Sequence, residues 1–274
     1  MPKNAPVYLN RTMQQFGLIG YPISHSLSPS LFKAGYDGKY SYVLIEEENF
    51  EKAYQRFIEE DFKGINVTAP FKEKALKKAD IISDECHLVG ATNLLIKTPE
   101  GIKAHNSDYL GVRLWLSGTS REAGSVPPRT INDKPTVLVI GSGGAGKAAA
   151  AAALSLGMET TILNRTQYSP EIRPLSDFRK EFRKADIVIY NLPVRIQELD
   201  TLTDEDFTPG KKKYILEANY RNPSFDNSLI QRMKKLNNDI TYTGGRTWLL
   251  LQALTGYEIF TGEKPDLAKM TACL

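Results

Sequence analysis

The chain has 274 residues, of which 41% are hydrophobic and 24% charged, values typical of globular proteins. Its net charge of +3 comes without a long basic run, which argues against nucleic-acid binding. No apolar run is long enough to span a membrane, and the N-terminal residues lack the apolar core of a signal peptide. We therefore expect a cytoplasmic protein of two domains that binds neither membrane nor nucleic acid.

The cysteines and histidines do not indicate a metal site. Cys86 and Cys273 are far apart and form no CxxC pair, so we expect reduced thiols. His25, His87 and His105 lack metal-ligand spacing.

The first predicted strand, Phe16 to Ile19, leads into the run HSLSP. Ser28 and Pro29 predict a helix start, with the serine as cap and the proline in the first turn. Ser26 and Ser28 would share a face in an extended segment, and hydroxyls beside a helix N-terminus suit a carboxylate or another anion. An ordinary Ser-Pro cap is the alternative.

Strand and helix then alternate. We expect a strand over Tyr40 to Ile45, an amphipathic helix over Phe50 to Glu60, a strand over Gly64 to Thr68 and a helical region to about Asp84. This alternation is typical of a parallel sheet with crossover helices.

The run GINVTAPFKEKAL brings polar groups to the end of a buried strand. Asn66 and Thr68 share one face, and Lys72 follows a break at Ala69-Pro70. The combination suits a polyhydroxylated substrate and a proton donor. A solvated lysine at a helix start is the alternative.

Further polar candidates follow in VGATNLLI and AHNSDYLG. We expect Asn93 to lie inside a strand, where a polar amide needs a buried partner or a ligand. Asp108 is expected to cap a helix over Tyr109 to Leu116, and that role alone could account for it. The Gly-, Ser- and Pro-rich stretch from Gly118 to Pro135 predicts a linker.

A strand over Thr136 to Ile140 then runs into GSGGAGKAAAAAAL, which matches the dinucleotide-binding G-x-G-x-x-G spacing between a strand and a helix. The cofactor-binding residues expected in this turn are Gly141, Gly143, Gly144, Ala145 and Gly146. The next strand, Thr160 to Leu163, ends in Asn164, Arg165 and Thr166 instead of the acidic residue of NAD-selective sites. Because arginine binds a 2′-phosphate, this favours NADP, with a surface arginine as the alternative.

Strands over Ile187 to Asn191 and Tyr214 to Glu217 should end at the same ligand crevice. The last apolar helix, in GGRTWLLLQALTGYEIF, carries Gln252, which could line the site or simply face solvent.

Together, these motifs and their order resemble the shikimate dehydrogenases and the related quinate/shikimate dehydrogenases. The resemblance covers nearly the whole chain and rests on HSLSP, NVTAPFK, GATN, NSD with Gly111, GSGGAGKA, NRT and the late Gln252-Ala253. It implies an α/β, two-domain protein: a substrate domain over residues 1–110, a Rossmann-type NADP domain over 111–243, and C-terminal helices over 244–274 that return to the substrate domain.

The resemblance also implies site roles. Lys72 and Asp108 match the catalytic pair, Ser26 and Ser28 the carboxylate-binding serines, and Gly245 a cofactor-side glycine. The positions that hold the ring hydroxyls and their surroundings are Asn66, Thr68, Asn93, Asp108 and Gln252.

The implied activity is the reversible NADP-dependent reduction of 3-dehydroshikimate to shikimate, on the route to chorismate and the aromatic amino acids, by a monomer or homodimer. Two alternatives remain open: a quinate/shikimate or aminoshikimate dehydrogenase that also uses NAD, and a diverged sensor without turnover. Lys72 and Asp108 argue against a sensor, which needs no proton donor.

The chain departs from the family pattern mainly on the cofactor side. Ser169 stands where a second basic residue is common, and Leu192 to Arg195 replace a TPxG-like motif. Arg221 falls where relatives have a carboxylate-binding tyrosine, and as a cation it could still bind a carboxylate. The GxxML motif is matched by Gly245 to Leu249, with Trp248 in place of methionine.

Overall fold

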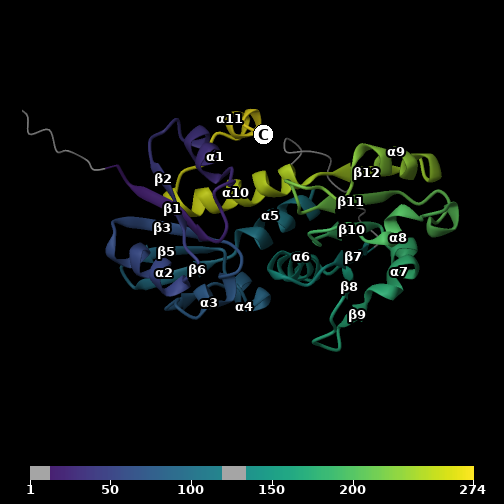
Figure 1. Cartoon of the computed structure of the whole chain (residues 1–274), viewed down its shortest axis with the longest axis horizontal. Helices are drawn as coiled ribbons and strands as arrows, with labels where there is room; N and C mark the ends of the chain where they lie inside the picture. Colours follow the sequence, from purple (N-terminus) through teal and green to yellow (C-terminus); the bar gives the residue numbers. More distant parts are fainter. Residues whose placement is uncertain (1–12, 119–133) are drawn as a thin grey trace, which may run out of the picture.

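The computed structural model describes residues 13–118 and 134–274. Within these residues the strands form two sheets, which Figure 1 shows side by side, with α5 and α6 between them and the long helix α10 reaching from one toward the other. Most of the expected linker, residues 119–133, lies outside the described residues.

The first sheet has the strand order β2-β1-β3-β5-β6-β4. Its strands are β1 (Gln15–Gly20), β2 (Ser41–Glu46), β3 (Phe62–Val67), β4 (Ile81–Ile82), β5 (Leu94–Thr98) and β6 (Gly101–His105). The helices of this part are α1 (Ser28–Gly35), α2 (Phe50–Glu59), α3 (Lys72–Leu76), α4 (Asp84–Val89) and α5 (Ser107–Leu116).

The prediction of a parallel sheet holds for only part of this sheet. β1 is parallel to β2 and β3, but β5 is antiparallel to both β3 and β6. A short turn joins β5 to β6, and a connection this short can join only antiparallel strands. The expected helix to Asp84 was also wrong, since α3 ends at Leu76 and the short strand β4 precedes α4.

The second sheet is parallel throughout, in the order β12-β11-β10-β7-β8-β9. Its strands are β7 (Thr136–Ile140), β8 (Glu159–Asn164), β9 (Ile172–Pro174), β10 (Ile187–Tyr190), β11 (Lys213–Glu217) and β12 (Ile240–Thr243). The remaining elements are α6 (Gly144–Ser155), η2 (Leu175–Asp177), α7 (Phe178–Lys184), α8 (Gln197–Asp200), η3 (Asp204–Asp206), α9 (Asn227–Leu236), α10 (Gly245–Thr261) and α11 (Leu267–Ala272). This order is that of a Rossmann sheet, whose ligand crevice opens where the chain reverses direction, beside β7 and β10.

Alternating apolar residues explain how the second sheet is covered. Val137 and Val139 face the core that includes α5, α6 and α10, whereas Leu138 and Ile140 face the core of α7 and α9. This alternation follows from the two-residue side-chain period of a strand.

Helices α5 and α10 cross closely between the two halves. A Cβ on Gly111 of α5 would lie 2.7 Å from the backbone nitrogen of Gln252 on α10, so only glycine permits this approach. The expected division at residues 110 and 111 falls inside the continuous helix α5. The three-part division by residue number stays a prediction.

Candidate active site

A cleft of about 460 Å³ lies between the carboxyl ends of β1 and β3 and the start of α6. Its lining includes these residues proposed from the sequence: Ser26, Ser28, Asn66, Thr68, Lys72, Asn93, Asp108, Ala145 and Gln252. Residues spread over nearly the whole chain therefore meet in one cavity.

The Lys72–Asp108 pair lies in the wall of this cleft. Lys72 begins α3, and its Nζ donates to Asp108 Oδ2 in an ion pair. The two side chains are only 17% and 8% exposed, so water screens the pair weakly.

The helix cap at α5 differs from the prediction. Asn106, not Asp108, is the N-cap, and its side-chain oxygen accepts from the Tyr109 backbone N–H at 3.0 Å. Asp108 sits one residue inside the helix, and its carboxylate points to Lys72 instead. The prediction that Asp108 caps this helix was therefore wrong. Because Asn106 is the cap, the Asp108 carboxylate is free to bind Lys72.

A chain of buried amides and hydroxyls forms the floor of the cleft. Asn66 accepts from the Tyr42 hydroxyl at 2.7 Å and donates to the Asn93 carbonyl at 3.2 Å. Asn93 Nδ2 donates to Ser107 Oγ at 3.0 Å, and Ser107 Oγ donates to Gln252 Oε1 at 3.1 Å. The expected buried partner of Asn93 is thus present, although Asn93 precedes β5 instead of lying within it. This network orients the polar groups that face the cavity.

The two serines of HSLSP lie together, with their Oγ atoms 3.2 Å apart. Helix α1 begins at Ser28, but Leu27 is its N-cap and no side chain caps it. The expectation that the Ser28 hydroxyl caps the helix was wrong. Both serines instead line the cleft, where their hydroxyls can donate to an anionic group.

The glycine turn after β7 has the geometry of a dinucleotide site. A Cβ on Gly146 would lie 1.9 Å from the Gly141 carbonyl oxygen, whereas one on Gly143 would meet nothing within 4 Å. The turn is thus tight at its base and open where a pyrophosphate would approach the N-terminus of α6. A Cβ on Gly144 would lie 3.3 Å from Cδ of Lys72, so the turn directly adjoins the ion pair.

An ion pair also joins α3 to α6 beside the cleft. Lys147 Nζ lies 2.8 Å from Glu73 Oε1. This hydrogen bond and the charge of Lys147 lower the pKa of the Glu73 carboxyl. The pair is largely exposed and contributes little to stability, but it links the two halves next to Lys72.

Asn164 is the last residue of β8, and Arg165 and Thr166 follow it at the sheet edge where the glycine turn follows β7. The strands pair with Ile140 opposite Leu163, which places the two strand ends side by side. Arg165 is exposed. Tyr168 ties this loop to the glycine turn, since its hydroxyl donates to the Ser142 carbonyl at 2.7 Å. Ser169, at the position of a common second basic residue, donates to the Glu171 carboxylate.

The prediction for Arg221 needs correction. Arg221 is exposed and is not among the residues that line the cleft, whereas its neighbour Tyr220 is. Burial raises the pKa of the Tyr220 hydroxyl, which keeps it a neutral donor. The sequence contained a usable signal, because Tyr220 follows the end of β11 and strand ends line the crevice.

Two further residues on this side, the departure Arg195 and the expected cofactor-side glycine Gly245, occupy structural positions. Arg195 forms ion pairs with Asp200, at 3.0 Å, and with Asp226. Gly245 begins α10, where a Cβ would lie 2.4 Å from the Tyr220 nitrogen, so it packs on the segment that carries Tyr220.

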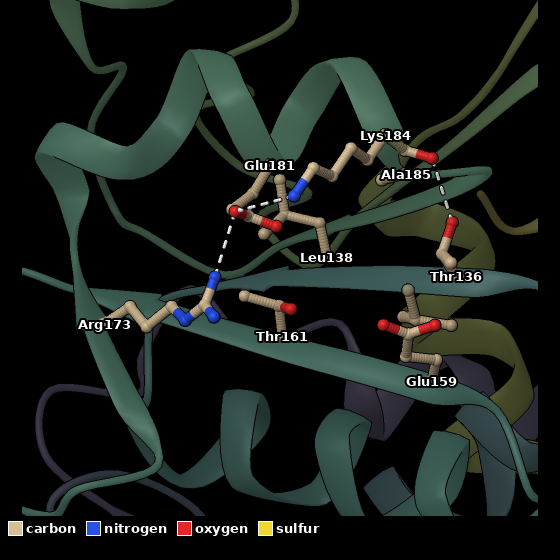
Figure 2. Close-up of a pocket in the computed structure, with 9 residues that line it drawn as sticks. Thr136, Leu138, Glu159, Thr161, Arg173, Glu181, Lys184 and Ala185 are labelled. Atoms are coloured by element: carbon tan, nitrogen blue, oxygen red, sulfur yellow. Dashed lines mark hydrogen bonds and ion pairs between the residues drawn. The ribbon is translucent and has the colours of Figure 1, made fainter.

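Figure 2 shows a second, smaller cavity on the second sheet, of about 110 Å³. Its lining includes Thr136 and Glu159, at the starts of β7 and β8. Glu181 also lines it and forms ion pairs with Arg173, at 2.9 Å, and with Lys184, at 3.5 Å. It therefore lies at the amino ends of parallel strands, opposite the edge where such sheets bind ligands. Three of its charged side chains, Arg173, Glu181 and Lys184, are already paired with one another.

Among residues 13–118 and 134–274, no helix combines the length and apolar character needed to cross a membrane. The same part of the chain holds no group of three or more His, Cys, Asp or Glu residues able to bind a metal ion.

Comparison with known proteins agrees with this geometry. Residues 18–95 match the shikimate dehydrogenase substrate binding domain, and residues 115–227 match the NAD binding domain of D-isomer specific 2-hydroxyacid dehydrogenases. The chain is 29% identical to the shikimate dehydrogenase (NADP(+)) of Archaeoglobus fulgidus, over 94% of this chain and 96% of that protein. It is also 29% identical to the protein of that name from Dinoroseobacter shibae, over 92% of this chain and 93% of that protein. The crystal structure of the Thermus thermophilus shikimate 5-dehydrogenase in complex with shikimate superposes with a TM-score of 0.75 at 25% identity, covering 95% and 97% of the two chains.

The fold and the cleft define a two-domain α/β dehydrogenase, in which a Rossmann unit faces a substrate domain that carries a lysine–aspartate pair. Within this class the chain belongs to the shikimate dehydrogenase family.

Proposed function

We propose that this protein is an NADP-dependent shikimate dehydrogenase that reversibly reduces 3-dehydroshikimate to shikimate on the route to chorismate and the aromatic amino acids. The observation that carries the proposal is the position of the Lys72–Asp108 pair. It lies in a cleft lined with hydroxyls and amides and directly adjoins the glycine turn of the Rossmann unit. A polyhydroxylated ring acid and a dinucleotide can thus meet at the same lysine.

In the proposed complex, the Ser26 and Ser28 hydroxyls and the neutral Tyr220 hydroxyl bind the substrate carboxylate. Asn66, Thr68, Asn93 and Gln252 bind the ring hydroxyls. These contacts orient the ring so that its ketone oxygen faces Lys72, which lowers the entropic part of the barrier.

The open turn over Gly143 and the exposed Arg165 fit a dinucleotide with a 2′-phosphate. Gly141, Gly143, Gly144, Ala145 and Gly146 would cradle the pyrophosphate, while Asn164, Arg165 and Thr166 would bind the adenosine end. When bound, NADPH supplies the hydride. The Lys72 ammonium donates the proton to the ketone oxygen, and Asp108 holds the amine in place. In the reverse direction Lys72 takes the proton back.

The activity test measures nicotinamide absorbance with the full chain, using shikimate or quinate, each with NADP⁺ or NAD⁺. We expect the highest kcat/KM for shikimate with NADP⁺. Some turnover with NAD⁺ is also expected, because Ser169 bonds to Glu171 where a second cation would favour the 2′-phosphate. Absence of turnover in every combination, with ligand binding shown by calorimetry, would establish the sensor alternative instead.

Replacement of Lys72 by alanine tests the assigned role. Loss of the proton donor should lower kcat by about 10²- to 10⁴-fold, the usual range for general acid–base catalysis. The affinity for NADPH, measured by fluorescence titration, should change less than about threefold, since the pyrophosphate binds backbone N–H groups. Lys74→Ala removes an exposed lysine from the same helix and is the matched control. Equal rates for both variants would exclude Lys72 as the donor.

We also propose that the enzyme works in the cytoplasm as a monomer or homodimer. Light scattering coupled to gel filtration of the purified chain distinguishes these states, and fractionation of the source cells tests the location.

A further inference from the structure

Trp248 is a departure from the family motif that lies in the active site. It occupies the position of methionine in the GxxML-like run and lies one helical turn before Gln252 on α10. Residues at this spacing share a helix face, and both line the cleft. Unlike methionine, tryptophan brings a hydrogen-bond donor to this face.

The donor is used within the catalytic pair. Trp248 Nε1 donates to Asp108 Oδ1 at 3.1 Å, and Lys72 Nζ donates to the other oxygen, Oδ2. Taken as whole residues, Trp248 and Asp108 are each 6% exposed, so solvent has little access to the carboxylate. Both oxygens of Asp108 thus have a protein donor, one neutral and one cationic.

The neutral indole N–H of Trp248 can hold the Asp108 carboxylate without taking part in proton transfer, which a second cation in its place could do. An indole N–H donates a hydrogen bond but neither gains nor loses a proton near neutral pH, so it cannot compete with Lys72 in proton transfer. A carboxylate held at one oxygen turns readily, because its terminal torsion is broad. A second donor from another helix removes that freedom and fixes the direction in which Oδ2 holds the lysine.

We propose that Trp248 is a positioning residue of this dehydrogenase, whose indole N–H fixes the Asp108 carboxylate so that Lys72 is aimed at the substrate carbonyl. The inference rests on the proposed function for its reaction, but the contact on which it depends can be measured separately.

The kinetic test compares Trp248→Phe with the unchanged chain at saturating NADP⁺. Loss of the donor should lower kcat about tenfold, while KM for shikimate stays within about twofold, because Trp248 acts on the lysine and not on the ring hydroxyls. Trp248→Met, which places the family residue there, should behave likewise. A kcat within twofold of the original, or a change in KM alone, would overturn the proposal.

A double-mutant cycle shows whether Trp248 acts through Asp108. In an Asp108→Ala background, Trp248→Phe should cause no further loss, since the group that it positions is gone. If the loss is the same in both backgrounds, the indole acts by another route and the inference is wrong. Melting temperatures of all variants identify any variant that does not fold.

The contact itself has a readout that needs no activity. With isotope-labelled tryptophan, the indole N–H resonances of Trp115 and Trp248 are assigned from the two Trp→Phe variants. Asp108→Ala should move the Trp248 resonance upfield and leave that of Trp115 nearly unchanged. An unmoved Trp248 resonance contradicts the contact even if shikimate is oxidised. A moved one with no turnover of any substrate shows instead that the proposed function has failed.

Discussion

At the scale of single residues, the second half of the molecule contains a buried charge unrelated to the cleft. Lys213 is 1% exposed at the start of β11, and its Nζ donates to the carbonyls of Phe182, at 2.6 Å, and Ala185. Burial lowers the pKa of Lys213 to about 7. Since this pKa lies below that of an unfolded lysine, the unfolded chain binds more protons between the two values, and stability rises with pH across that window.

Lys213→Met should therefore change the pH dependence of stability. From about pH 7 to about pH 9, the native chain should gain about 2 kcal/mol of unfolding free energy relative to the variant. Urea unfolding of both proteins at the two pH values measures this difference, and other titrating groups cancel. Lys212→Met, at the exposed neighbouring position, should show no such dependence. A constant difference between native chain and Lys213→Met would mean that Lys213 stays charged in the fold.

At the scale of elements, the N-terminus of α5 determines where the catalytic carboxylate lies. Asn106 accepts from the Tyr109 N–H at 3.0 Å and donates through Nδ2 to the Ala91 carbonyl at 2.9 Å, and it is 1% exposed. This one side chain both starts the helix and ties it to the segment before Asn93. Asp108 is thereby held two residues further along, facing Lys72.

Asn106→Ala should destabilise the protein by about 2 kcal/mol, because it removes a cap and leaves the buried Ala91 carbonyl unpaired. It should also lower kcat, as the helix start can then shift. Asn49→Ala removes the exposed N-cap of α2 and should cost only about 1 kcal/mol, without an effect on kcat. Urea unfolding and steady-state kinetics measure both quantities. A similar kcat for the two variants would mean that the cap does not position Asp108.

At the scale of the whole molecule, the two sheets share one hydrophobic core. The cluster that contains Phe16 and Phe32 of the first half also contains Val137 and Ile187 of the second, joined through α5, α6 and α10. The crossing of α5 and α10 at Gly111 is therefore both the connection between the halves and the support for Gln252.

Gly111→Ala should disturb both the packing between the two halves and the position of Gln252. The new methyl group would meet backbone atoms that cannot move aside, so we expect a loss of about 2 kcal/mol from overpacking and a higher KM for shikimate through displacement of Gln252. Gly256→Ala at the same crossing should cost less, since its Cβ would lie 3.1 Å from the side chains of Leu94 and Ser107, compared with 2.7 Å from the Gln252 backbone at Gly111. Thermal unfolding and shikimate saturation curves test whether Gly111→Ala has the larger effect on stability and on KM. Equal effects at the two positions would contradict it.

Much of this organisation can be read from local pattern. The Rossmann unit follows from its strand, glycine turn and helix, since Gly141, with φ at +94°, and Gly146, packed on the Gly141 carbonyl, each meet a local backbone constraint. The polar residues at the end of β3 and in the segment that follows it, Asn66, Thr68 and Lys72, could be recognised as cleft residues because strand ends of α/β sheets face ligands. What local pattern could not supply was the choice between equivalent neighbours: Asn106 or Asp108 as the cap, Tyr220 or Arg221 at the cleft, a parallel or antiparallel β5.

Each of those choices depends on contacts between segments distant in the chain. Asn106 caps because the Ala91 carbonyl also needs its amide, and Asp108 turns away because Lys72 and Trp248 bind its two oxygens. Residue types and strand periodicity are local properties, so the amino-acid sequence alone defines the class of fold and the chemistry available. The partner of each buried polar group depends on which helices cross, and only the folded chain brings those helices together.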